Sequence, residues 1–331
     1  MEMATLGSSA LKISQMGLGL AALGRPGYIN LGHAQDLNEE YEVAAMEAHT
    51  HTVLDAAWAA GIRYFDAARS YGRAEAFLGS WLKQRNIAPS AVAVGSKWGY
   101  TYTAGWQVEA EKHEVKEHSR PVLQRQIGES RALLGSYLNL YQVHSATLDS
   151  GVLENEAVLN ELARLRAEGL LIGLSLSGAN QADTLYRALA VRVDGRPLFD
   201  SVQATWNLLE QSVGPALQEA HAAGMGVLIK EALANGRLTP RNSEPDFQSK
   251  MALLNEVSAN HNTTVDALAL AAVLAQPWVD VVLSGAATVE QLQSNVLAVD
   301  VKWDEATALA LQSLRENPET YWHTRSQLAW N

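Results

Sequence analysis

The hydrophobic positions of this chain fall into short apolar runs that alternate with longer amphipathic ones. The short runs read as strands buried on both faces of a sheet, and the longer runs have the pattern of helices that cover such a sheet. Eight strands are predicted, over Ile13–Leu18, Ile62–Asp66, Val92–Lys97, Leu138–His144, Leu170–Ser175, Ser201–Ala204, Met225–Lys230 and Val279–Leu283. Eight helices are predicted between and after them, over Glu47–Ala60, Ala74–Gln84, Pro121–Leu134, Glu154–Glu168, Ala182–Ala190, Gly214–Ala223, Lys250–Asn260 and Val265–Ala275.

The ends of several predicted helices carry recognisable signals. Ser119 can cap a helix that has Pro121 just inside its first turn. Asp149 and Ser150 precede the acidic turn Glu154–Glu156 and are expected to start the next helix. Three glycines stand where helices should end, at Gly61, Gly169 and Gly224.

The succession of eight strand–helix units favours an α/β fold of one kind, a closed (β/α)₈ TIM barrel. An open doubly wound sheet would usually carry a Gly-rich phosphate turn after its first strand, and Leu18–Gly24 lacks that pattern. The chain has 331 residues, 47% of them hydrophobic, and no linker divides it. Because such barrels run to about 250 residues or more as one unit, we expect a single domain over residues 1–331.

Polar and aromatic side chains follow the ends of three successive predicted strands. Asp66 ends one strand and Tyr71 follows five residues later, while Lys97 and His144 end the next two. The carboxyl ends of barrel strands meet at one face, where α/β folds keep their chemistry, so we expect the four to lie together. A phenol has a pKa of about 10, so Tyr71 could donate a proton near neutral pH only in a buried setting beside a cation such as Lys97.

These residues also carry a resemblance to a known family. The segments Phe65–Gly72, Ser96–Lys97 and Tyr141–His144 match, in order and spacing, the catalytic segments of the aldo-keto reductase superfamily, and the chain resembles that family nearly end to end. The resemblance implies a TIM barrel with an N-terminal β-hairpin, within Ala4–Ile13, and extended loops over the C-terminal face.

The resemblance further implies a reaction and four roles. A nicotinamide cofactor would give hydride to a carbonyl carbon while Tyr71, as general acid/base, gives a proton to the oxygen. Lys97, held as a cation by Asp66, would lower the pKa of Tyr71, and His144 would orient the carbonyl. The expected enzyme is an NAD(P)H-dependent aldo-keto reductase, of carbonyl reductase or alcohol dehydrogenase type, with a small-molecule substrate.

By the same resemblance, eight residues would bind the cofactor, namely Ser175, Gln203, Lys230, Ser284, Gly285, Thr288, Gln291 and Asn295. Ser175 and Gln203 would hold the nicotinamide carboxamide, but Leu176 replaces an Asn that commonly helps them. Lys230 stands where many relatives place an aromatic ring against the nicotinamide.

The resemblance implies NADP(H) as the cofactor, but this chain lacks residues that usually bind its 2′-phosphate. In the segment that resembles the family's 2′-phosphate loop, Gly285, Ala287 and Gln291 occupy sites that usually carry Lys or Arg. A phosphate monoester strongly favours such cations, so these residues favour NAD(H) or dual use. Helix amides after Thr288, or Arg237 from another loop, could still hold a phosphate.

Aromatic residues crowd the predicted mouth of the barrel. Trp98, Trp106 and Trp206 are candidate substrate-pocket residues, and the tail adds Trp322 and Trp330. Such a pocket suits aromatic, hydrophobic or ring-shaped carbonyl compounds, although sugars stack on aromatic rings too.

Composition narrows the class of protein. The formal charge of −11 argues against nucleic acid or an acidic membrane as a partner, and the absence of Cys excludes disulfides and thiolate chemistry. There is no signal-peptide pattern and no apolar run near the roughly 20 residues of a membrane span, so a cytoplasmic protein is expected. His113 and His118 lie in a charged stretch without a second ligand cluster, so no metal is expected. Whether the chain forms an oligomer is left open.

Two other functions stay open. A cofactor-sensing regulatory subunit resembling the potassium-channel β subunits would keep the barrel and much of the tetrad, with weak turnover and stable binding to a membrane protein. A barrel lyase or aldolase would use Lys97 as a Schiff base, which leaves Asp66 and Tyr71 without their matched roles.

Overall fold

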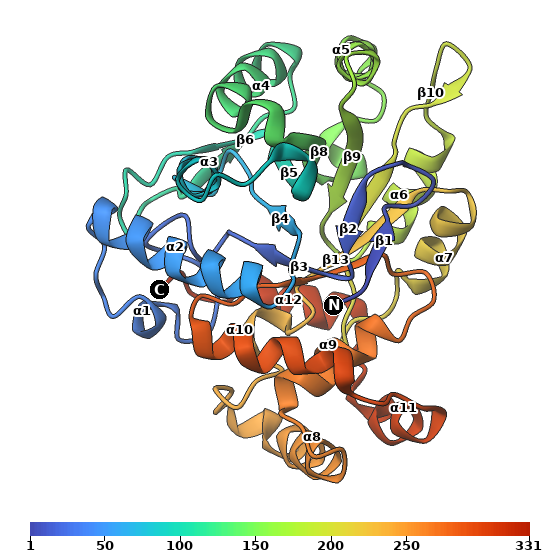
Figure 1. Cartoon of the computed structure of the whole chain (residues 1–331). Coiled ribbons are helices and arrows are strands. Elements are labelled where there is room, and N and C mark those ends of the chain that lie inside the picture. Colours follow the sequence, from blue (N-terminus) through green and yellow to red (C-terminus); the bar gives the residue numbers. More distant parts are fainter.

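A computed structural model describes residues 1–331 and contains a closed barrel of eight parallel strands (Figure 1). Around the barrel the strands run β12 (Ser201–Thr205), β13 (Gly226–Lys230), β14 (Val281–Ser284), β3 (Met16–Gly19), β4 (Tyr64–Asp66), β5 (Ala93–Trp98), β8 (Leu138–Ala146) and β9 (Leu171–Leu176). Each of the eight predicted strands is present, so the predicted α/β TIM barrel is confirmed.

Helices surround the barrel and alternate with its strands (Figure 1). All the predicted helices form, with ends shifted by a few residues, as α2 (Val43–Ala59), α3 (Ala74–Gln84), α4 (Arg120–Leu134), α5 (Glu156–Ala167), α6 (Gln181–Ala190), α7 (Gly214–Ala222), α8 (Gln248–Asn260) and α9 (Val265–Leu274). The structure adds four helices, α1 (His33–Asp36), α10 (Val289–Val296), α11 (Glu305–Leu311) and α12 (Pro318–Ser326). It also adds two small antiparallel pairs, β6 (Tyr100–Tyr102) with β7 (Glu114–Lys116), and β10 (Arg192–Val193) with β11 (Arg196–Pro197).

A hairpin of β1 (Met3–Thr5) and β2 (Lys12–Ser14) lies across the amino-terminal end of the barrel (Figure 1). Leu6 and Ile13 from this hairpin are fully buried and pack against apolar side chains of the barrel strands. The expected hairpin is therefore confirmed. Ile13 belongs to it rather than to the first barrel strand, which begins at Met16.

The capping signals are confirmed except at α5. The Ser119 hydroxyl accepts a hydrogen bond from an amide in the first turn of α4. The expected cap at Asp149 and Ser150 is wrong, because both residues lie in a separate 3₁₀ turn, and Asn155 caps α5 instead. The three glycines beyond helix ends all have left-handed backbone, with φ of 90° at Gly61, 100° at Gly169 and 88° at Gly224.

Gly24, in the loop after β3, lies tightly against the loop that follows β4. A Cβ at this position would lie 2.2 Å from the carbonyl oxygen of Tyr71 and 2.5 Å from Cβ of Ala74. We expect Gly24→Ala to lower the free energy of unfolding by about 1–3 kcal/mol, because overpacking forces the two loops apart. Urea unfolding followed by circular dichroism would measure the loss.

Gly128→Ala, in α4, is the matched control. A Cβ there meets no atom within 4 Å, and Ala is favoured over Gly inside a helix, so a gain of about 0.5–1 kcal/mol is expected. Equal changes for the two substitutions would contradict the tight packing inferred for Gly24.

Candidate active site

Four side chains converge where β4, β5 and β8 end. Asp66 closes β4, Lys97 lies in β5, His144 lies in β8, and Tyr71 lies in the loop after β4. Lys97 Nζ forms an ion pair with Asp66 and lies 3.4 Å from the hydroxyl of Tyr71, and the rings of Tyr71 and His144 meet edge to face with centroids 5.5 Å apart. The structure thus brings together the four residues that the sequence singles out.

The carboxylate of Asp66 is held from several sides. It is only 2% exposed, and its Oδ1 accepts hydrogen bonds from Gln203 at 3.0 Å, Gln142 at 3.3 Å and the hydroxyl of Tyr64 at 3.3 Å. Gln142 was not expected in this cluster. A signal for it was present, because Gln142 stands two residues before His144 on a strand and so points to the same side.

The pKa of Tyr71 lies above its ordinary value, although Lys97 lies beside its hydroxyl. Burial raises it most, the negative charge of Asp66 raises it further, and the cation that opposes them is Arg25. Tyr71 therefore keeps its proton throughout the neutral range. A group that must donate a proton needs to be in that state.

Arg25 is a site residue that sequence reasoning missed. It is 3% exposed, lines the pocket, and donates to the Ser70 carbonyl at 3.0 Å and to Glu114 at 3.1 Å. Its guanidinium carbon lies 5.2 Å from the ring centroid of Tyr71 and 4.8 Å from that of Trp330. Arg25 follows the first barrel strand. A search for charged residues after the end of that strand, as was made for the next three, would have found it.

His144 is a neutral imidazole. Burial lowers its pKa well below the ordinary value, and the nearby cations Lys97 and Arg25 lower it further. Its Nδ1 lies 3.4 Å from the hydroxyl of Ser70. When Ser70 donates to Nδ1, the ring proton is on Nε2, and His144 can donate one hydrogen bond.

One continuous pocket of about 680 Å³ runs from these residues to the start of α10. Six predicted cofactor residues line it, namely Gln203, Lys230, Ser284, Gly285, Gln291 and Asn295. Ser175 does not, and its hydroxyl accepts from the amide of Ser145 at 2.8 Å. Thr288 does not either, since its side chain caps α10 by accepting from the amide of Gln291 at 3.3 Å.

Lys230 lies in the pocket within a network of charges. Its Nζ donates to Thr205 at 2.7 Å and lies 3.5 Å from Glu231. Burial lowers the pKa of Lys230 to about 8, with Arg325 and Lys97 acting in the same direction. Burial acts to raise the pKa of Glu231, but Arg325 and Lys230 together hold it at about 2. Lys230 is therefore a cation that loses its charge in mildly alkaline solution.

The three predicted substrate-pocket tryptophans lie away from the pocket lining, so that expectation is wrong. Trp98 is fully buried, because it alternates with Lys97 and so points away from the barrel interior. Trp106 donates to the Tyr41 carbonyl at 2.6 Å, and Trp206 packs against Trp278 with centroids 5.7 Å apart. The rings that line the pocket besides Tyr71 and His144 are those of Tyr28 and Trp330.

Arg237, a candidate for phosphate binding, is not part of the pocket lining. It pairs with Glu316 at 2.7 Å and lies over the rings of Phe247 and Tyr321. Another arginine of the same loop, Arg241, lines the pocket instead and binds Asp36 with both ends of its guanidinium group.

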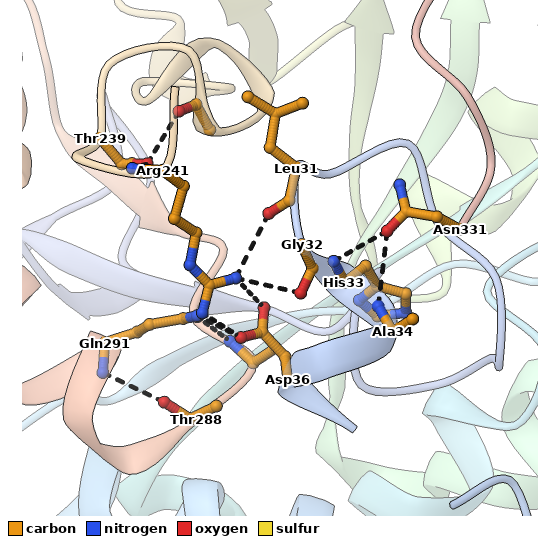
Figure 2. Close-up of polar contacts among 12 residues, drawn as sticks. Leu31, Gly32, His33, Ala34, Asp36, Thr239, Arg241, Thr288, Gln291 and Asn331 are labelled. Carbon is orange, nitrogen blue, oxygen red and sulfur yellow. Dashed lines mark hydrogen bonds and ion pairs between the residues drawn. The ribbon is translucent and has the colours of Figure 1, made fainter. Parts of the chain in front are cut away.

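Figure 2 shows the side chains of Arg241 and Gln291 reaching the carboxylate of Asp36. The same segment is held on its other side by Asn331, whose Oδ1 accepts from the amides of His33 at 2.9 Å and Ala34 at 3.4 Å. The chain after β3 is thus attached both to the loop after β13 and to the carboxyl terminus.

The two histidines considered for a metal are engaged with backbone carbonyls. The Nε2 atom of His113 lies 2.8 Å from the oxygen of Val108, and that of His118 lies 2.9 Å from the oxygen of His144. A carbonyl oxygen only accepts, so in both histidines this ring nitrogen donates.

The structure contains no helix with the length and apolar character of a membrane span.

Comparisons with known proteins agree with this architecture. The model of the aldo/keto reductase family matches residues 15–316. The chain is 26% identical over 332 residues to aldo-keto reductase str7 of Strobilurus tenacellus, covering 93% of this chain and 90% of the relative. It is 25% identical over 346 residues to an NADH-specific methylglyoxal reductase of Escherichia coli (strain K12), covering 96% and 99%. The holo form of aldo-keto reductase AKR11C1 from Bacillus halodurans matches its fold with a TM-score of 0.73 at 22% identity, over 96% of this chain and 97% of that chain.

The closed barrel and the family match over nearly the whole chain define an oxidoreductase of the nicotinamide-dependent class. The chain belongs to the aldo/keto reductase family. Its activity is therefore oxidation or reduction at carbonyl groups of small molecules.

Proposed function

We propose that this protein interconverts an aldehyde or ketone and the corresponding alcohol, with Tyr71 as the proton donor and acceptor. The observation that carries the proposal is the hydroxyl of Tyr71 in the pocket, 3.4 Å from Lys97 Nζ, which is itself paired with Asp66. The whole chain, residues 1–331, would form the single catalytic domain. A location in the cytoplasm remains a prediction.

The pocket fits a nicotinamide dinucleotide in shape and in polar groups. It is elongated between Tyr71 and α10, and it carries Asn235, whose buried side-chain oxygen has no partner within the protein. A Cβ added at Gly285 would meet no atom within 4 Å, so the backbone there leaves room for a ligand. When bound, the cofactor would supply or accept a hydride.

The protein's own groups would supply the rest of the chemistry. Tyr71 would give its proton to the carbonyl oxygen as negative charge develops there, and Lys97 would stabilise the phenolate that remains. Neutral His144 would donate a hydrogen bond that positions the same oxygen. Asp66 would keep Lys97 charged and fixed, since a buried ammonium is costly without a partner.

A direct test follows nicotinamide absorbance with NADH and with NADPH over aromatic, aliphatic, dicarbonyl and sugar substrates. Turnover with any of these carbonyls would support the proposal. Binding of a cofactor without turnover of any carbonyl would instead favour the regulatory-subunit function. The Escherichia coli relative is described as NADH-specific, which supports inclusion of NADH from the start.

Lys230 predicts a pH dependence of cofactor binding. Its pKa of about 8 means that it is a cation below this pH and neutral above it. The cofactor is an anion, so its dissociation constant should rise about tenfold as pH increases through this range, from loss of a charge-assisted contact. Fluorescence titration of the bound nucleotide would measure the effect.

Lys230→Met should remove that pH dependence. Lys250→Met is the matched control, because Lys250 pairs with Glu316 outside the pocket lining and should leave the dependence intact. The same pH dependence in Lys230→Met and in the native protein would show that another group titrates.

A further inference from the structure

The end of the pocket at α10 is organised around a buried carboxylate, that of Asp36. Asp36 is 4% exposed and lies behind Arg241 and Gln291, both of which line the pocket. Its Oδ1 accepts from Gln291 Nε2 at 2.8 Å, and Arg241 NH1 donates to its Oδ2 at 2.9 Å while NH2 binds the other oxygen (Figure 2). The only arginine that lines this end is therefore already neutralised.

The donors of Gln291 are also occupied. Gln291 Oε1 accepts from the amide of Ala287 at 2.9 Å, and the amide of Gln291 donates to the cap Thr288 at 3.3 Å. Because Gln291 Nε2 donates to Asp36, both the nitrogen and the oxygen of this side-chain amide are hydrogen-bonded within the protein. A phosphate arriving here would have to displace these bonds to gain Gln291 as a donor.

The local charge is unfavourable for an added anion. The carboxylates of Asp266 and Glu290 line this end of the pocket, with that of Asp36 behind them, and Arg241 is the one arginine or lysine of the lining there. Three carboxylates against one guanidinium leave a surplus of two negative charges. A phosphate monoester carries nearly two more, so the field at this end disfavours it.

We propose that Asp36 makes this protein select NAD(H) over NADP(H), by neutralising Arg241 and orienting Gln291 so that neither can hold a 2′-phosphate. The inference rests on the proposed function, because the reacting end of the cofactor must lie beside Tyr71 and His144. The adenosine half then occupies the other end of the same pocket, at α10. Asp36 acts through its two partners and is a positioning residue for cofactor choice.

The test is the ratio of two dissociation constants, those for NADPH and NADH, measured by fluorescence titration. The native protein should bind NADH at least about tenfold more tightly than NADPH, given the surplus of negative charge at this end of the pocket. Asp36→Asn keeps the shape and an acceptor for Gln291 but frees the charge of Arg241. It should lower the NADPH dissociation constant about tenfold and change that for NADH by less than about twofold.

A merely structural role for Asp36 would move both constants together and leave the ratio unchanged. The matched control is Asp55→Asn, which breaks another Asp–Arg pair with two hydrogen bonds, between α2 and Arg85 at the end of α3. It removes the same unit of charge and should alter neither constant. Gln291→Lys is a second route to the same result, since it places a cation at the pocket wall and should also tighten NADPH binding alone.

The outcomes separate the two proposals. Tighter binding of NADPH than NADH by the native protein, or an unchanged ratio in Asp36→Asn, would overturn the role of Asp36 while leaving the reductase function standing. Failure of the native protein to bind either nucleotide would overturn the proposed function itself, and the inference with it.

Discussion

Tyr71→Phe is expected to lower kcat by about 10²–10⁴-fold, because it removes the one group placed to give a proton to the carbonyl oxygen. Cofactor affinity should be unchanged, since the ring keeps its contact with His144 and its place under Arg25. Absorbance assays of turnover, together with fluorescence titration of bound nucleotide, would separate the two quantities.

Tyr137→Phe is the control for loss of a phenol. The hydroxyl of Tyr137 donates to the carbonyl of Ile87 at 2.7 Å, and the residue does not line the pocket. This variant should lose about 1 kcal/mol of stability and keep full turnover. If Tyr71→Phe also kept more than about a tenth of native kcat, the proton would come from another donor.

Lys97→Met is expected to be the most destabilising single change at the site. It leaves the carboxylate of Asp66, 2% exposed, without its ion-pair partner, and breaking a buried pair in this way costs about 3–5 kcal/mol. Turnover should fall steeply as well, because the change removes the ammonium group that lies within hydrogen-bonding distance of the Tyr71 hydroxyl. Urea unfolding would give the stability and the absorbance assay the turnover.

A double variant separates the two effects. Asp66→Asn together with Lys97→Met removes both buried charges and should recover most of the stability but none of the turnover. Arg85→Met, which breaks the exposed pair with Asp55, should cost less than about 1 kcal/mol. A loss no larger in Lys97→Met than in Arg85→Met would mean that the buried charge of Asp66 is compensated elsewhere.

The barrel could be predicted because strands buried on both faces are apolar without interruption, and such runs recur eight times. The four converging residues could be predicted because strand ends in a barrel share one face. The same rule of alternation that places Lys97 inside β5 turns Trp98 outward, so the expectation that Trp98 lines the pocket neglected a signal in the sequence.

Other site residues lie where no periodic pattern exists. Arg25 lies in the irregular segment after β3 and Asp36 in the four-residue helix α1, and Asp36 meets its partners Arg241 and Gln291 only through tertiary folding. The sequence separation within these pairs is 205 and 255 residues. The raised pKa of Tyr71 could not be predicted for a related reason, since this pKa depends on the degree of burial as well as on which charges lie near.

The order of strands around the barrel also bears on how the chain folds during synthesis. The barrel closes where Met16 of β3 pairs with Val282 of β14, so this seam joins the first barrel strand made to the last. Until residue 284 has left the ribosome, β3 remains an edge strand with unpaired backbone groups, which can pair with other chains. β3 has only four residues, and short edges of this kind offer little template for aggregation.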